Sequence, residues 1–135
     1  MASDPKLDLL HGIPLFARLG KKEIERLGQL TEELDLRVGK VLMRQGDRGE
    51  EMFVVAAGKV VVERDGAILG ERGPGSVLGE IALLSEGPRT ATVTATEPTR
   101  VFVLGHREFH ALMDEMPTVR TAVLEVLASR IAHAD

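Results

Sequence analysis

The sequence predicts a mostly-β fold, an eight-stranded β-roll of the jelly-roll type with an N-terminal helix, one short internal helix and two C-terminal helices. Short, Val-rich segments alternate with glycine-containing turns over residues 34–105, as is typical of barrels and jelly rolls. Helical periodicity flanks this region over residues 7–33 and 106–134. No linker or repeat interrupts the chain, so all 135 residues are expected to form a single domain.

The N-terminal segment is predicted to be helical because Ile24, Leu27 and Leu30 recur at helical spacing among charged residues. Ahead of them, the apolar run 13–16 contains a proline. We expect this run to form a short turn that leads into the helix.

Eight strands are expected in the central region, each bounded by a turn signal. The strongest signal is Asp65-Gly66 between two apolar runs, because a two-residue hairpin turn needs positive φ at both positions and Asp-Gly tolerates them. The predicted strands cover residues 34–38, 41–44, 52–56, 59–64, 67–71, 76–78, 91–96 and 100–104.

Two helices are expected after the strands. Phe109, Leu112 and Met113 share one face of the first, and Pro117 suits the first turn of the second. The second helix carries an apolar stripe made of Val119, Val123, Val126, Leu127 and Ile131. This stripe can pack on the barrel or pair with a second copy of the chain, so a homodimer through the last helix is one hypothesis.

Composition excludes several classes of function. Seventeen basic against 21 acidic residues give a net charge of −4, which is not the basic footprint of a protein that contacts nucleic acid. The chain has no cysteine, so disulfides, thiolate nucleophiles and Cys-ligated metals are excluded. No apolar run approaches 18 residues and no signal core is found, so we expect no membrane span and a cytoplasmic location.

Signatures of enzymes and metal sites are incomplete. His106 and His110 are four residues apart, but no glutamate occupies the metalloprotease position between them, so they are interpreted as part of a solvated helix face. The predicted strands carry no histidine, which excludes a cupin-type metal centre. The glycines at 73, 75 and 79 do not have dinucleotide-loop spacing. We therefore expect no catalysis, no metal and no cofactor.

Residues 79–91 break the strand pattern. Glu80 to Leu84 favour a helix of little more than one turn, and Gly79 before it permits close approach to its unpaired backbone N–H groups. Arg89 follows, and a guanidinium beside a helix N-terminus suits a phosphate. The Glu80 carboxylate repels phosphate but accepts hydrogen bonds from sugar hydroxyls. Together these groups indicate a nucleotide.

The two-part segment Gly79-Glu80-Ile81-Ala82-Leu83 and Pro88-Arg89-Thr90-Ala91 resembles the phosphate-binding cassette of the cyclic-nucleotide-binding domain family. This family includes catabolite activator protein, protein kinase A regulatory subunits and cyclic-nucleotide-gated channels. The resemblance extends from about Leu10 to Arg130 and includes the glycines at 39, 46, 58 and 75. It implies a regulatory module, not an enzyme, whose ligand is a cyclic nucleotide, with cAMP preferred over cGMP.

The resemblance also implies a role for each site residue. Arg89 is expected to pair with the cyclic phosphate and Glu80 to accept from the ribose 2′-hydroxyl. The backbone near Ile81, Ala82 and Ala91 is expected to face the phosphate. The other residues expected at the ligand are Gly79, Thr90, Val62, Leu69 and Arg130.

The base contacts are less specific. Thr90 is expected near both phosphate and purine, or simply to begin a strand. Val62 and Leu69 are expected to line the base pocket. Arg130 either covers the purine or extends its charge to water beside the apolar stripe. Leu78 departs from the family pattern, since many members have Phe there, but it is another apolar residue at a packing position.

The family implies a hinge mechanism. Phosphate capture pulls the cassette inward, the helix that contains Phe109 follows, and the last helix folds over the purine. The effector that such a switch controls is not identified by the sequence. The alternative hypothesis is a degenerate domain that keeps only the fold and serves as a protein-interaction or dimerisation module. Replacing Arg89 by alanine distinguishes the two.

Overall fold

The protein is described by a computed structural model, which defines residues 4–132 and divides the chain into two compact units. One unit comprises Thr31–His106, and the other combines the segments that precede and follow it. We refer to them as the β unit and the helical unit. That the whole chain acts as a single domain stays a prediction.

The helical unit begins with two α-helices where the sequence predicted one. Asp4 caps the first by accepting from the backbone N–H of Lys6 at 2.9 Å. Gly12 ends that helix, and Pro14 then starts a 3-10 turn in the predicted apolar run. The elements are α1 (Pro5–His11), η1 (Pro14–Phe16), α2 (Lys21–Leu30), α3 (His106–Glu115) and α4 (Pro117–Ala132). Residues 133 and 134 of the predicted last helix lie outside the described residues.

Aromatic and aliphatic side chains form the core of the helical unit. The rings of Phe16 and Phe109 lie 5.6 Å apart between centroids and are both fully buried. Val123 of the predicted α4 stripe is buried with them, whereas Ile131 at the end of the same stripe is 75% exposed. The predicted stripe is therefore buried at Val119, Val123 and Val126 and exposed at its end.

A bidentate ion pair links α2 to the end of α3. The guanidinium of Arg26 donates to Glu115 through two nitrogens, at 2.7 and 3.0 Å. A second pair joins Arg18 to Glu125 of α4 at 3.1 Å. The planar guanidinium fork matches a carboxylate geometrically, so the Arg26 pair has a better-defined orientation than a single contact.

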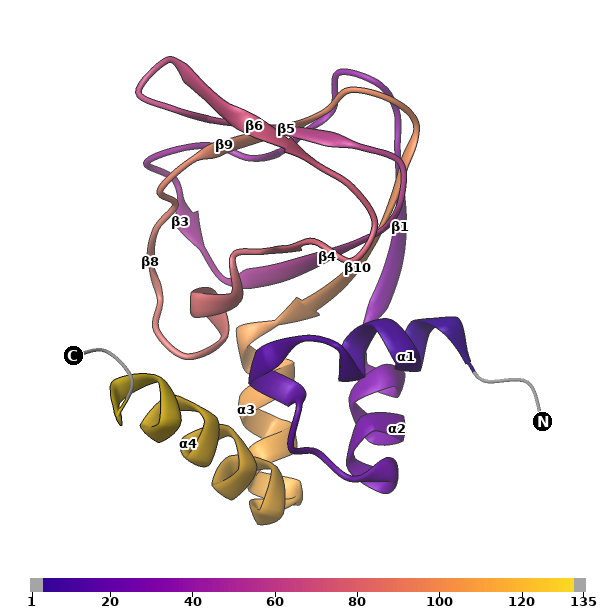
Figure 1. Ribbon diagram of the computed structural model, residues 1–135, viewed down its shortest axis with the longest axis vertical. Coiled ribbons are helices and arrows are strands. Elements are labelled where there is room, and N and C mark those ends of the chain that lie inside the picture. The colour runs from indigo at the N-terminus through magenta and orange to yellow at the C-terminus, as the bar shows by residue number, and fades with distance from the viewer. Residues whose placement is uncertain (1–3, 133–135) are drawn as a thin grey trace. The chain divides into compact units, whose positions relative to one another are not determined.

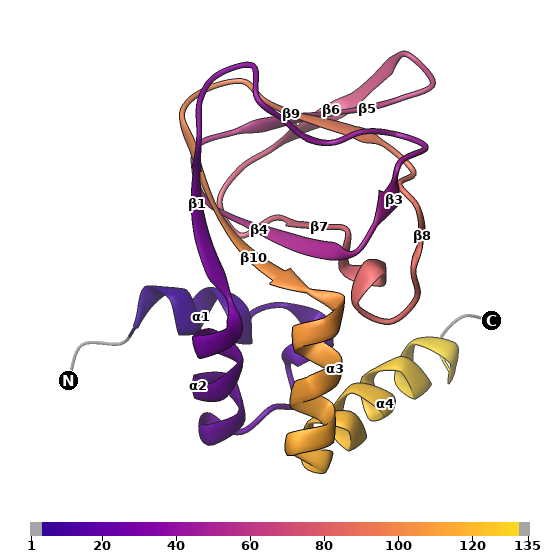
Figure 2. The ribbon, with the colours of Figure 1, turned by 180° about the vertical axis from the view of Figure 1, so that it is seen from behind.

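The β unit contains ten antiparallel strands among the described residues, two more than predicted. Two four-stranded sheets have the orders β1-β10-β4-β7 and β2-β9-β5-β6, and β3 pairs with β8. Figures 1 and 2 show β5, β6 and β9 opposite β4 and β10, with β3, β8 and a short helix at one end of the roll. The strands are β1 (Glu32–Leu36), β2 (Val41–Met43), β3 (Arg48–Gly49), β4 (Glu51–Ala57), β5 (Val60–Arg64), β6 (Ala67–Arg72), β7 (Val77–Leu78), β8 (Gly87–Pro88), β9 (Thr92–Ala95) and β10 (Thr99–Gly105).

The roll is closed around an apolar core, and its hairpin turn is the predicted one. Asp65 and Gly66 have φ of 53° and 80°, as a two-residue hairpin between β5 and β6 requires. The core residues occupy every second position of β4, β5, β9 and β10, so they share the inner face of the roll. They are Leu36, Phe53, Val55, Val60, Val62, Leu78, Ala91, Val93, Ala95, Val101 and Val103.

None of the described helices is both long and apolar enough to cross a bilayer.

The Arg26–Glu115 pair predicts a pH-dependent contribution to stability. Its hydrogen bonds hold the pKa of Glu115 below the ordinary carboxyl value. A group of this kind stabilises the fold at pH values above its unfolded pKa, and the contribution is lost as the pH falls through the lowered folded value. We expect Glu115→Gln to lower the free energy of unfolding at pH 7. The difference from wild type should shrink as the pH falls below about 4, and it should vanish once Glu115 is protonated in the folded protein as well. Urea unfolding at a series of pH values measures it.

Glu25→Gln is the matched control, because it removes the same charge from an exposed position on α2. The control is expected to track the wild type at every pH. A loss for Glu115→Gln that persists unchanged at pH 3 would contradict the ion-pair explanation.

Candidate functional site

The segment 79–91 folds where the sequence predicted a short helix and a loop. The helix is η2 (Glu80–Leu83), a 3-10 and not an α-helix. Gly79 precedes it with φ of 72°, a left-handed conformation that favours glycine. The backbone N–H of Ala82 donates to the Gly79 carbonyl at 3.0 Å, so one N–H predicted to face a phosphate is already engaged.

The Arg89 side chain lies in a slot between two glycines, Gly49 and Gly79. A Cβ atom at Gly49 would lie 2.2 Å from Nε of Arg89, and one at Gly79 would lie 2.4 Å from its Nη1. Real Cβ atoms do not approach this closely, so both positions must be glycine for the guanidinium to stay where it is. The Cζ atom also lies 5.7 Å from the centre of the Phe53 ring, which is within cation–π distance.

Backbone pairing fixes the root of the Arg89 side chain. Its N–H donates to the Asp47 carbonyl at 2.7 Å, and its carbonyl accepts from Gly46 at 2.9 Å. Immediately before it, β8 pairs with β3, which sets Gly49 opposite Gly87. An ion pair between Arg48 and Glu86 joins the same two segments. These contacts hold the loop that carries Arg89 against the turn before β4.

The charge of Arg89 is partly desolvated. Burial lowers its pKa, an effect that the nearby Glu51 carboxylate opposes. An arginine has so high an ordinary pKa that it stays protonated at neutral pH. No carboxylate among residues 4–132 forms an ion pair with Arg89. A half-buried cation with no carboxylate at contact distance among the described residues is suited to bind an anion.

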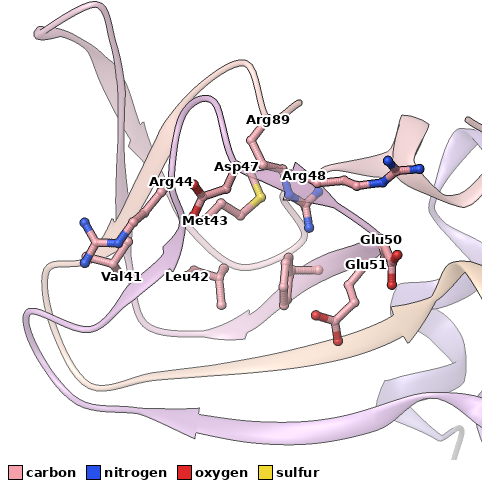
Figure 3. A pocket seen from close by; sticks show the side chains of 10 residues that line it. Val41, Leu42, Met43, Arg44, Asp47, Arg48, Glu50, Glu51 and Arg89 are labelled. Carbon is pink, nitrogen blue, oxygen red and sulfur yellow. The ribbon is translucent and has the colours of Figure 1, made fainter. Parts of the chain in front are cut away.

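Two cavities meet at Arg89. The cassette cavity, of about 330 Å³, is lined by Met43, Gly79, Glu80, Ile81, Ala82, Ser85, Gly87, Pro88, Arg89 and Thr90. The second, of about 340 Å³, is lined by residues of β2, the following turn and β4. Figure 3 shows Arg89 in this second cavity beside Met43 and Asp47, whereas Arg44 and Arg48 point away from it. Each volume is at the lower end of the range for small-molecule pockets.

Six of the ten predicted ligand-binding residues line the cassette cavity. The other four do not. Val62 and Ala91 are buried in the core of the roll, and Leu69 is 47% exposed on the edge strand β6. Arg130 lies on α4 in the helical unit. The ligand contacts assigned to these residues stay predictions. The six are Gly79, Glu80, Ile81, Ala82, Arg89 and Thr90.

Sequence reasoning missed several residues of the site, including Met43 and Gly49. Met43 lines both cavities, but three-residue β2 is too short for its alternation to reveal an inward side chain. Gly49 resembles any turn glycine in the sequence, because its role arises from the pairing of β3 with β8, which is distant along the chain. No local signal identifies it.

The slot around Arg89 predicts a specific coupling between two substitutions. Gly49→Ala should lower the free energy of unfolding by about 1–3 kcal/mol, as is usual when a packed site is overfilled. In an Arg89→Ala background the same change should cost much less, because the colliding side chain is absent. Denaturant unfolding of the two single variants and the double variant measures this coupling energy.

Gly87→Ala is the control, because nothing lies within 4 Å of a Cβ atom at that position. It should show no coupling to Arg89→Ala. Additive effects of Gly49→Ala and Arg89→Ala would mean that the guanidinium does not occupy the slot.

Comparisons with known proteins agree with this geometry. Residues 33–116 match the cyclic nucleotide-binding domain family. The cyclic AMP receptor protein of Thermus thermophilus is 34% identical over 134 residues, which cover 93% of this chain and 61% of that protein. A cGMP-dependent protein kinase of Caenorhabditis elegans is 31% identical over 85% of this chain and 15% of its own length. This chain therefore spans less than two thirds of either relative.

The fold has a solved counterpart. The N-terminal domain of a transcriptional regulator from Streptomyces coelicolor is 36% identical, with a TM-score of 0.88. The match covers 94% of this chain and 92% of that one. The family match includes the whole segment that holds Arg89 and both cavities. The chain belongs to the cyclic nucleotide-binding domain family.

Proposed function

We propose that this chain is a regulatory module that binds a cyclic nucleotide at the cassette cavity, with cAMP preferred over cGMP. The observation that carries the proposal is Arg89, a partly desolvated guanidinium held between Gly49 and Gly79 that forms no ion pair with a carboxylate of residues 4–132. A cyclic phosphodiester carries one negative charge shared by two exocyclic oxygens, which match the planar fork of arginine.

Glu80 supports a nucleotide over a simple anion. It is half-buried and lines the same cavity as Arg89. Its ionised carboxylate has no proton to donate, so it can only accept hydrogen bonds. A ribose 2′-hydroxyl supplies the donor, whereas inorganic phosphate next to Glu80 would be repelled. The pair therefore selects a ligand with an anionic end and a hydroxyl beside it.

The base preference rests on the relatives and on Thr90. The relative that matches 93% of this chain is a cyclic AMP receptor protein, and the kinase relative depends on cGMP. Thr90 lines the cavity and is exposed, so its hydroxyl is available to a ligand. We assign cAMP as the first ligand and cGMP as the second.

The proposed output is a change in the C-terminal helices. A ligand shifts a conformational equilibrium only by its different affinity for the two states. In this proposal, the phosphate draws the cassette inward, α3 follows, and α4 brings Arg130 to the purine. Leu124 and Ile131 of α4 are exposed apolar residues, which supports pairing of this helix with a second copy. The module itself performs no catalysis and is proposed to act in the cytoplasm.

Ligand-dependent stability tests the proposal. cAMP at about 1,000 times its dissociation constant should raise the free energy of unfolding by roughly 4 kcal/mol, which is several degrees in the midpoint of thermal unfolding. The shift should vanish in Arg89→Ala and persist in Arg37→Ala, an exposed arginine elsewhere in the β unit. 5′-AMP should give little or no shift. If no cyclic nucleotide stabilises the wild type at millimolar concentration, the fold-only interaction module replaces this proposal.

The role of Glu80 has its own test. Glu80→Gln should weaken cAMP binding, because an amide is a weaker acceptor than a carboxylate. Calorimetric titration with 2′-deoxy-cAMP supplies the control. Wild type should bind the deoxy ligand less tightly than cAMP, whereas the variant should distinguish the two ligands much less. If wild type and Glu80→Gln prefer cAMP over 2′-deoxy-cAMP by the same factor, Glu80 does not bind the ribose 2′-hydroxyl.

A further inference from the structure

His106 occupies the junction between the two units. It is the last residue of the β unit and the first residue of α3. Its ring atom Nδ1 lies 2.9 Å from the carbonyl oxygen of Ala82 in η2. Its backbone N–H donates to the Glu50 carbonyl at 2.7 Å, just before β4. One residue thus bonds to two walls of the site, through its side chain to one and through its backbone to the other.

The side-chain bond has a defined direction. A carbonyl oxygen only accepts, so Nδ1 of His106 carries the hydrogen in this contact. The acceptor belongs to Ala82, a buried residue that lines the cassette cavity. η2 has only four residues, and so short a helix is not stable by itself in water. Its position therefore depends on bonds of this kind from the surrounding structure.

We propose that His106 is a positioning residue for the cyclic-nucleotide site, which fixes η2 through the Ala82 carbonyl. The inference rests on the proposed function for the identity of the ligand. A ligand that stabilises η2 strengthens this bond, and the bond in turn favours the η2 geometry that binds the ligand. The effect is reciprocal, because coupling between two sites is a single free energy.

Two amide variants distinguish the effect of losing the hydrogen bond to Ala82 from the effect of losing the imidazole ring. In His106→Asn the side-chain nitrogen can take the place of Nδ1, whereas in His106→Gln it takes that of Nε2. Both variants keep the backbone bond to Glu50. We expect His106→Gln to raise the Kd for cAMP by about 3- to 10-fold, the cost of one hydrogen bond. His106→Asn should stay within about 2-fold of wild type, as expected when the bond is kept. His110→Gln, one turn further along α3, is the control and should leave the Kd unchanged.

Hydrogen exchange in the ligand-free protein gives a second readout that needs no ligand. The backbone N–H groups of Leu84 and Ser85 donate to the Ile81 carbonyl at 3.0 and 2.9 Å. They report on whether η2 is formed. Their exchange should be faster in His106→Gln than in wild type or His106→Asn, while exchange in β10 stays unchanged. A general loss of stability would accelerate both regions.

The outcomes are distinguishable. Weaker binding and faster η2 exchange in His106→Gln, with both kept in His106→Asn, support the positioning role. Equal behaviour of the two amide variants in Kd and exchange overturns it. If wild type does not bind cAMP, the proposed function fails, and exchange at Leu84 and Ser85 alone then decides whether His106 positions η2.

Discussion

The site depends on the close packing of the charged Arg89 side chain between two glycines. The guanidinium of Arg89 fits only because neither Gly49 nor Gly79 carries a Cβ atom. The two glycines come from different parts of the chain, and the pairing of β3 with β8 brings one of them to the site. The position of Arg89 at both cavities and the partial desolvation of its charge follow from this arrangement.

Local signals in the sequence predicted the parts of the molecule that local interactions determine. Asp65-Gly66 specified its hairpin turn because only a few residue pairs tolerate positive φ twice in succession. The cassette was located because helix-forming residues interrupt a run of strands. Gly12 and Pro14 divide the N-terminal segment into two helices, and the helical periodicity after them did not reveal that division.

Contacts between distant segments account for what the sequence did not predict. β3 and β8 have two residues each. They are too short to show an alternation of apolar and polar residues, and their pairing depends on the closed roll. The same limit applies to Gly49 and Met43. Ile131 continues the apolar spacing of α4 but remains exposed, because periodicity identifies one face of a helix and not where its covering ends.

The division of the chain has a consequence for how the molecule is made. The helical unit is built from the two ends of the chain, with the entire β unit inserted between them. The ion pair between Arg26 and Glu115 therefore closes a long loop, and loop closure is entropically costly until the intervening chain is compact. Synthesis runs from the N-terminus, so α1 and α2 are made before the β unit. They can pack against α3 only after the whole β unit has been synthesised. The helical unit can thus form only after α3 and α4 have been synthesised behind the β unit.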